Sequence, residues 1–151
     1  MKPAESSQNI DLNGLFISRV ESTNIEEASY SNLDLCLAFE KSVPGSILRK
    51  LVKSIPRQLL MASLGSSTED YSKLVRRKFL TVNQTDSLNE LTKAGAELRQ
   101  LFCWKQEVLE EWIEQKLPTL GGAKVRQLIV TNSGRIVIRE LIDEMRSGEF
   151  A

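Results

Sequence analysis

Apolar residues recur three or four positions apart along most of the chain from residue 46 onward. This spacing gives each helical turn one apolar face and therefore predicts α-helices. We expect helices over residues 46–55, 57–64, 68–79, 83–102, 106–116, 124–130 and 131–147. Several boundaries carry residues that start or end helices, with Pro56 before one helix and Gly65 and Gly148 after two others. The pattern predicts an all-α fold.

Polar and small residues refine this assignment. Side-chain oxygens can cap a helix by accepting hydrogen bonds from its first backbone N–H groups. The candidate caps are Ser66, Ser67 and Thr68, then Asn83 or Thr85, and finally Thr131, Asn132 and Ser133. Ala62 is expected where two helices pack closely, since a small side chain lets their backbones approach, and Gly95 is expected to mark close packing against a partner.

The first 43 residues lack the regular spacing. Residues 1–32 are rich in Ser, Asn and Glu around the apolar stretch Gly14–Val20, which is either one strand or a loose helix. Leu33–Phe39 does not distinguish between helix and strand either, and Pro44 with Gly45 marks a break. We treat residues 1–43 as an N-terminal arm and a candidate dimerisation segment.

The charge is balanced in total but uneven along the chain. Lys+Arg and Asp+Glu each number 20. Residues 1–48 carry a net charge of −4, residues 49–78 carry +6 and residues 79–151 carry −2. A local basic excess is typical of an anion-binding surface, with nucleic acid as the first candidate. A solvated helix face without any ligand is the alternative interpretation.

The basic block coincides with a predicted helix-turn-helix. The helix over 57–64 is followed by Gly65 and by a second helix that runs to about Phe79, with Arg76-Arg77-Lys78 in its last turn. In a DNA-binding helix-turn-helix the second helix enters the major groove. The candidate DNA-binding residues are Ser67, Thr68, Tyr71, Ser72, Lys73, Arg76, Arg77 and Lys78. Two packed helices with a basic rim and no DNA are the alternative.

The residue types present exclude several kinds of chemistry. The chain has no histidine, so Ser-His-Asp and Cys-His catalysis and His-containing zinc sites cannot form within it. We expect no catalytic residue, no metal and no cofactor. Cys36 and Cys103 form no CxxC pair, and we expect both to be buried free thiols. The polar first residues and short apolar runs predict a cytoplasmic protein that does not enter a membrane.

A series of residues near the end of the chain has a recognisable order. It consists of Trp112, Leu120-Gly121-Gly122-Ala123-Lys124, Leu128-Ile129, Thr131-Asn132-Ser133-Gly134, Val137, Leu141-Ile142 and Gly148-Glu149-Phe150-Ala151. This order resembles the C-terminal domain of the MbcA/ParS/Xre antitoxin family, although Val125 stands where a proline often follows the Gly-Gly loop. The upstream segment Pro44–Leu101 is similar to the Xre-type helix-turn-helix of the same family.

The resemblance implies an antitoxin paired with a toxin encoded next to it, usually of the NAD⁺-consuming RES class. The antitoxin would cover the toxin's active site with its C-terminal domain and tail, which here carries the candidate toxin-binding residues Arg146, Gly148, Glu149, Phe150 and Ala151. It also implies a homodimer within a larger toxin–antitoxin complex and binding to the promoter DNA of its own gene.

These inferences divide the chain into three parts. Residues 1–43 are the arm, residues 44–103 the Xre-like DNA-binding domain, and residues 104–151 the toxin-binding domain. The expected function is a type II antitoxin that represses its own promoter. The alternative is a stand-alone helix-turn-helix regulator without a toxin partner.

Overall fold

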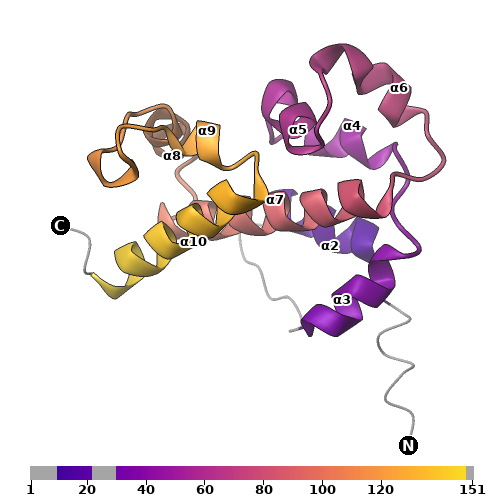
Figure 1. Ribbon diagram of the computed structural model, residues 1–151, viewed down its shortest axis with the longest axis horizontal. Coiled ribbons are helices and arrows are strands. Elements are labelled where there is room, and N and C mark those ends of the chain that lie inside the picture. Colours follow the sequence, from indigo (N-terminus) through magenta and orange to yellow (C-terminus); the bar gives the residue numbers. More distant parts are fainter. Residues whose placement is uncertain (1–9, 22–29, 149–151) are drawn as a thin grey trace, which may run out of the picture. The chain divides into compact units, whose positions relative to one another are not determined.

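The computed structural model describes residues 10–21 and 30–148, and all of its regular elements are helical (Figure 1). In chain order they are α2 (Leu12–Glu21), α3 (Asn32–Phe39), α4 (Ile47–Leu51), α5 (Arg57–Ser63), α6 (Tyr71–Val75), α7 (Val82–Leu101), α8 (Gln106–Ile113), α9 (Val125–Leu128) and α10 (Asn132–Ser147), with 3₁₀-helices at Thr68–Asp70 and Pro118–Leu120. The prediction of an all-α fold is confirmed. In the part of the chain that the structure describes, no helix combines the length and apolar character needed to span a bilayer.

The chain divides into two compact units, and the boundary between them falls within the sequence of α7. The N-terminal unit is Met1–Asn89 and the C-terminal unit is Glu90–Ala151. The boundaries expected from the sequence lay after residues 43 and 103 instead. Both undecided segments of the expected arm are helical, as α2 and α3. Helix α2 packs against α4 within the N-terminal unit, so it belongs to the core of this unit and not to a separate arm.

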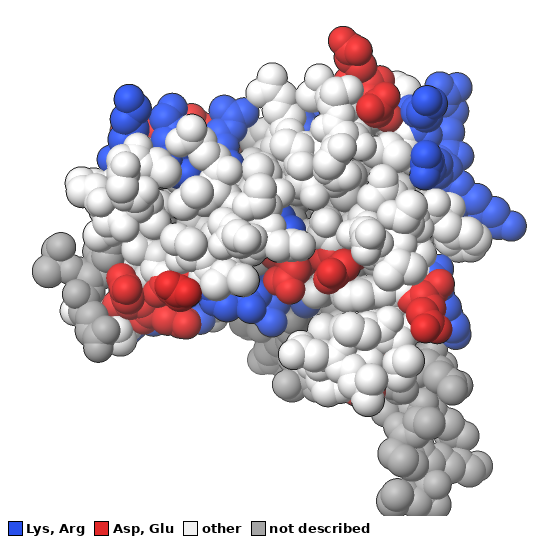
Figure 2. Space-filling view, in the orientation of Figure 1, with Lys and Arg blue, Asp and Glu red and all other residues white. Residues whose placement is uncertain are grey.

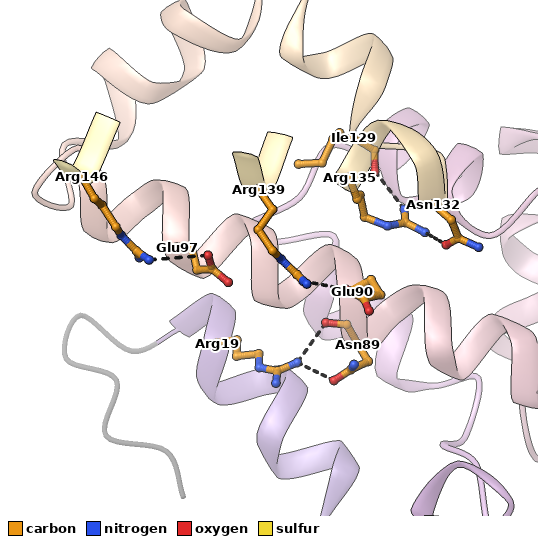
Figure 3. A network of polar contacts seen from close by, with 9 residues as sticks. All are labelled: Arg19, Asn89, Glu90, Glu97, Ile129, Asn132, Arg135, Arg139 and Arg146. Atoms are coloured by element: carbon orange, nitrogen blue, oxygen red, sulfur yellow. Dashed lines mark hydrogen bonds and ion pairs between the residues drawn. The ribbon is translucent and has the colours of Figure 1, made fainter. Parts of the chain in front are cut away.

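Helices α2, α4 and α5 supply most of the core of the N-terminal unit. Its fully buried side chains include Phe16, Leu48, Leu51, Leu60 and Met61. The buried Arg19 of α2 donates hydrogen bonds to the backbone oxygen and to Oδ1 of Asn89, at 3.0 and 2.9 Å (Figure 3). These bonds satisfy a charged group that would otherwise be costly to bury, and they fix α2 to the N-terminal half of α7.

The close approach of helices in this unit occurs at a different residue from the one expected. Ala62 is exposed, so the prediction that it lies between packed helices is wrong. The tight position is Gly45, where a Cβ atom would overlap the carbonyl oxygen of Leu74 in α6. A glycine before α4 thus permits the contact between α4 and α6.

The start of α7 is capped by Thr81, which is not among the predicted caps. Thr81 Oγ1 accepts a hydrogen bond from the N–H of Gln84 at 3.1 Å, and Gln84 Oε1 accepts one from the N–H of Thr81 at 3.0 Å. This reciprocal pair is a capping box. Thr85 is instead fully buried, and its hydroxyl lies 2.6 Å from the hydroxyl of Ser42. The cap expected at Asn83 or Thr85 is therefore wrong.

The C-terminal unit packs α8 against α9 and α9 against α10. Thr131 caps α10, as expected, by accepting a hydrogen bond from the N–H of Gly134 at 2.9 Å. The guanidinium of the buried Arg135 donates to the carbonyl oxygen of Ile129 at 2.9 Å and to Oδ1 of Asn132 at 2.6 Å (Figure 3). These bonds hold the turn between α9 and α10 in one conformation.

Replacing either of two glycines in this unit by alanine should change stability, but in opposite directions. At Gly134 a Cβ atom would overlap the carbonyl oxygen of Leu128, and we expect Gly134→Ala to lower the free energy of unfolding by about 1–3 kcal/mol. At Gly95 a Cβ atom would meet only Nη1 of Arg99 at 3.6 Å, an ordinary contact. No close packing on Gly95 occurs within the described part of the chain, so in the isolated protein Gly95→Ala should raise the free energy of unfolding by about 1 kcal/mol. Urea denaturation of the two variants measures both effects, and equal midpoints would contradict the packing at Gly134.

Both cysteines are free and exposed, which contradicts the expectation of buried thiols. Cys36 lies on the outward face of α3, beside the exposed Leu33 and Leu37. Cys103 lies in the turn after α7 with a φ of 54°. An apolar neighbourhood in the sequence was therefore a poor guide to burial at both positions.

Candidate nucleic-acid interface

Helices α5 and α6 occupy the segment in which a helix-turn-helix is predicted. Gly65 follows α5 with a φ of 71°, as expected, and the N–H of Ser66 donates back to the carbonyl oxygen of Met61 at 2.9 Å. The chain then forms the 3₁₀-turn Thr68–Asp70, which packs against α5 and leads directly into α6. The 3₁₀-turn thus contacts both helices and connects them.

The second helix is shorter than expected. It ends at Val75, so the prediction that it runs to about Phe79 is wrong. The N–H of Gly45 donates to the carbonyl oxygen of Arg77 at 3.0 Å, and the N–H of Leu80 donates to that of Val43 at 2.8 Å. These bonds between residues 43–45 and 77–80 replace further helical bonds. The basic triplet Arg76-Arg77-Lys78 therefore lies in the segment after α6.

All eight basic side chains of residues 49–78 are exposed. They are Arg49, Lys50, Lys53, Arg57, Lys73, Arg76, Arg77 and Lys78. Figure 2 shows basic atoms gathered over α6 and the segment that follows it. None of the eight forms a salt bridge with another residue in the described ranges. We call these eight side chains the basic surface.

Basic residues of the C-terminal unit behave differently. Arg139 and Arg146 of α10 reach Glu90 and Glu97 of α7, at 3.0 and 3.8 Å (Figure 3). Lys124 and Arg126 both pair with Glu114, at 3.7 and 3.2 Å. Four cations of this unit are thus neutralised locally, whereas those of the basic surface are available to an external anion.

The polar residues predicted to read DNA are also accessible. Ser67, Thr68, Ser72 and Lys73 are exposed, and only Tyr71 is half-buried. Ser67 does not cap the following turn with its side chain, because its hydroxyl donates to the carboxylate of Asp70 at 3.3 Å. The eight predicted DNA-binding residues therefore lie within one stretch that runs through α6 into the basic triplet.

Arg57 is a residue of this surface that the sequence analysis did not assign to the site. Its guanidinium lies over the ring of Tyr71, with 4.0 Å between Cζ and the ring centroid. The only sequence signal was the position of Arg57 in the basic block. Its contact with Tyr71 follows from the way α5 meets the start of α6, which the sequence pattern does not give.

The predicted toxin-binding residues are only partly described. Arg146 is exposed, and Gly148 ends α10 with a φ of 76°, as expected for a left-handed cap. Glu149, Phe150 and Ala151 lie outside the described residues. The loop before α9 carries Gly121 and Gly122, both with positive φ, at 66° and 85°. Residues other than glycine rarely adopt this backbone conformation, which explains why two glycines stand at these positions.

Two further observations concern chemical groups. Within residues 10–21 and 30–148, no group of three Cys, Asp or Glu side chains is placed to hold a metal ion. Burial lowers the pKa of the Arg99 guanidinium in α7, because loss of water disfavours its charged form. The basic surface is the feature from which a function can be argued.

Comparison with known proteins adds no assignment. The sequence matches no protein-family model. A search of curated proteins finds no match either.

Proposed function

We propose that the protein is a type II antitoxin. It binds the promoter of its own gene through the basic surface of the N-terminal unit, and it neutralises an NAD⁺-consuming toxin of the RES class through the C-terminal unit and tail. The observation that carries the DNA-binding half is the basic surface, with eight exposed cations and no salt bridge among the described residues.

Electrostatics supports the DNA-binding half. Cations that contact phosphates release the counterions condensed on DNA, which makes association favourable at moderate salt. The basic surface surrounds a helix-turn-helix, whose second helix is the element that reads bases. Exposed hydroxyl and amine groups on Ser72 and Lys73 supply hydrogen-bonding partners at that helix.

Sequence resemblance supports the toxin-binding half. The family's motif residues occupy structural positions in the C-terminal unit: Gly121 and Gly122 in left-handed conformation, Thr131 as the cap of α10 and Gly148 as its end. The tail after Gly148 carries Phe150, an aromatic residue of the kind that anchors interfaces. On this proposal the partners are the neighbouring toxin, promoter DNA and a second copy of the chain, in the cytoplasm.

A stand-alone transcriptional regulator is the second candidate. The basic surface favours it equally, because DNA binding by the N-terminal unit needs no toxin. Only a toxin partner separates the two functions. Inhibition of the product of the adjacent reading frame by this chain tests the antitoxin function. A chain that binds the promoter but does not inhibit this product would favour the stand-alone regulator.

A further inference from the structure

Arg57 is held more closely on an aromatic ring than Lys78, the other member of the basic surface with such a contact, whose Nζ lies 5.7 Å from the ring centroid of Phe79. An exposed arginine ordinarily samples many rotamers, and ordering it on binding costs entropy. Here the guanidinium rests on the ring of Tyr71, with Cζ 4.0 Å from the centroid. Tyr71 is half-buried and is the first residue of α6, so part of its ring is already removed from water.

The stack leaves the donors of Arg57 available. A cation–π contact uses the face of the guanidinium, whereas its N–H groups point outward in the plane. In the described ranges, no hydrogen bond or ion pair engages those groups. A planar fork of N–H donors that is oriented in advance matches the oxygens of a phosphate.

The place of Arg57 in the motif indicates that the phosphate belongs to the DNA backbone. Arg57 is the first residue of α5, the first helix of the helix-turn-helix. That helix crosses the sugar–phosphate backbone while the second helix enters the groove. Contacts to the backbone fix the position of the protein without reading sequence.

We propose that Arg57, stacked on Tyr71, binds a backbone phosphate of duplex DNA. Arg57 makes the contact, and Tyr71 is a positioning residue that acts through Arg57. This site rests on the DNA-binding half of the proposed function. It also changes the role expected for Tyr71, from a residue that contacts DNA to one that supports the residue that does.

The salt dependence of binding tests the contact made by Arg57. We would measure the affinity of the full chain for a duplex from the region upstream of its own gene and for a random duplex of equal length, between about 50 and 200 mM salt. Arg57→Ala should weaken binding to both duplexes roughly tenfold and reduce the slope of log affinity against log salt by about one. Lys105→Ala removes the same charge at an exposed position of the C-terminal unit and should leave the slope unchanged.

A double-mutant cycle tests the role of Tyr71. Tyr71→Leu should weaken binding about two- to fivefold, and Tyr71→Phe, which keeps the ring, should bind like the wild type. In the Arg57→Ala background, Tyr71→Leu should have no further effect. Thermal melts of each variant check that the fold is retained.

Several outcomes would overturn the proposal. An unchanged slope for Arg57→Ala, or an equal loss of slope for Lys105→Ala, would show that Arg57 makes no phosphate contact. Neither result would argue against DNA binding by the protein as a whole. A loss in Tyr71→Phe as large as that in Tyr71→Leu would show that the hydroxyl acts directly. A wild-type chain that binds neither duplex would overturn both this site and the DNA-binding half of the proposed function.

Discussion

Replacing Arg76 and Arg77 together by alanine is expected to weaken promoter binding roughly 100-fold, because each hydrogen bond to a charged group contributes about 1.5 kcal/mol or more. Both side chains are exposed and form no salt bridge within the described part of the chain. Loss of two phosphate contacts should also reduce the salt slope by about two. Fluorescence anisotropy with labelled promoter DNA at several salt concentrations measures both quantities.

The backbone around this segment makes the expected effect specific. The carbonyl oxygen of Arg77 accepts the N–H of Gly45, so the position of the triplet is set by main-chain bonds and should survive the loss of its side chains. The matched control is the double replacement of Arg139 and Arg146 by alanine. It removes the same charge from two arginines that already pair with Glu90 and Glu97. If this control weakened promoter binding as much as the test variant, the loss would reflect net charge and not a contact surface.

Removing residues 149–151 is expected to abolish neutralisation of the toxin. Ending the chain after Gly148 keeps the left-handed cap of α10, which a cut before Gly148 would destroy. The truncated chain loses Phe150 and Glu149, the aromatic anchor and the acidic group proposed to enter the toxin's active site. Growth of cells that produce the toxin together with the full or truncated chain gives the readout, and only the full chain should restore growth.

Two controls separate loss of contact from loss of fold. The truncated chain should keep its melting temperature, and its affinity for promoter DNA should be unchanged because the basic surface is intact. Full protection by the truncated chain, at equal protein levels, would show that the tail does not carry neutralisation.

Much of the fold was predictable because helical spacing and cap residues agree at the same positions. Helix α10 begins after Thr131 and ends before Gly148, as expected. Gly65 adopts the left-handed conformation that its place after α5 predicts. These features are local, since they depend on residues within one turn of each other. The net charge of the basic block was equally predictable, because it is a sum over residues and does not depend on how the chain folds.

The remaining features depend on contacts between segments far apart in the sequence. Helix α6 ends at Val75 because residues 43–45 take up the backbone groups of residues 77–80. Gly45 matters because Leu74 approaches it, and Arg57 matters because Tyr71 lies beneath it. No periodicity in the sequence encodes these pairs, so the sequence pattern places the triplet in a helix and does not single out Arg57.

Neutralisation of an NAD⁺-consuming enzyme by this chain can be measured by titrating the chain against that enzyme. The product of the adjacent reading frame would be purified, and its consumption of NAD⁺ measured as the full chain is added. If the chain is an antitoxin, NAD⁺ consumption should stop at a fixed molar ratio, and the two proteins should then elute as one complex. Undiminished NAD⁺ consumption in the presence of excess folded, DNA-binding chain would contradict the antitoxin function.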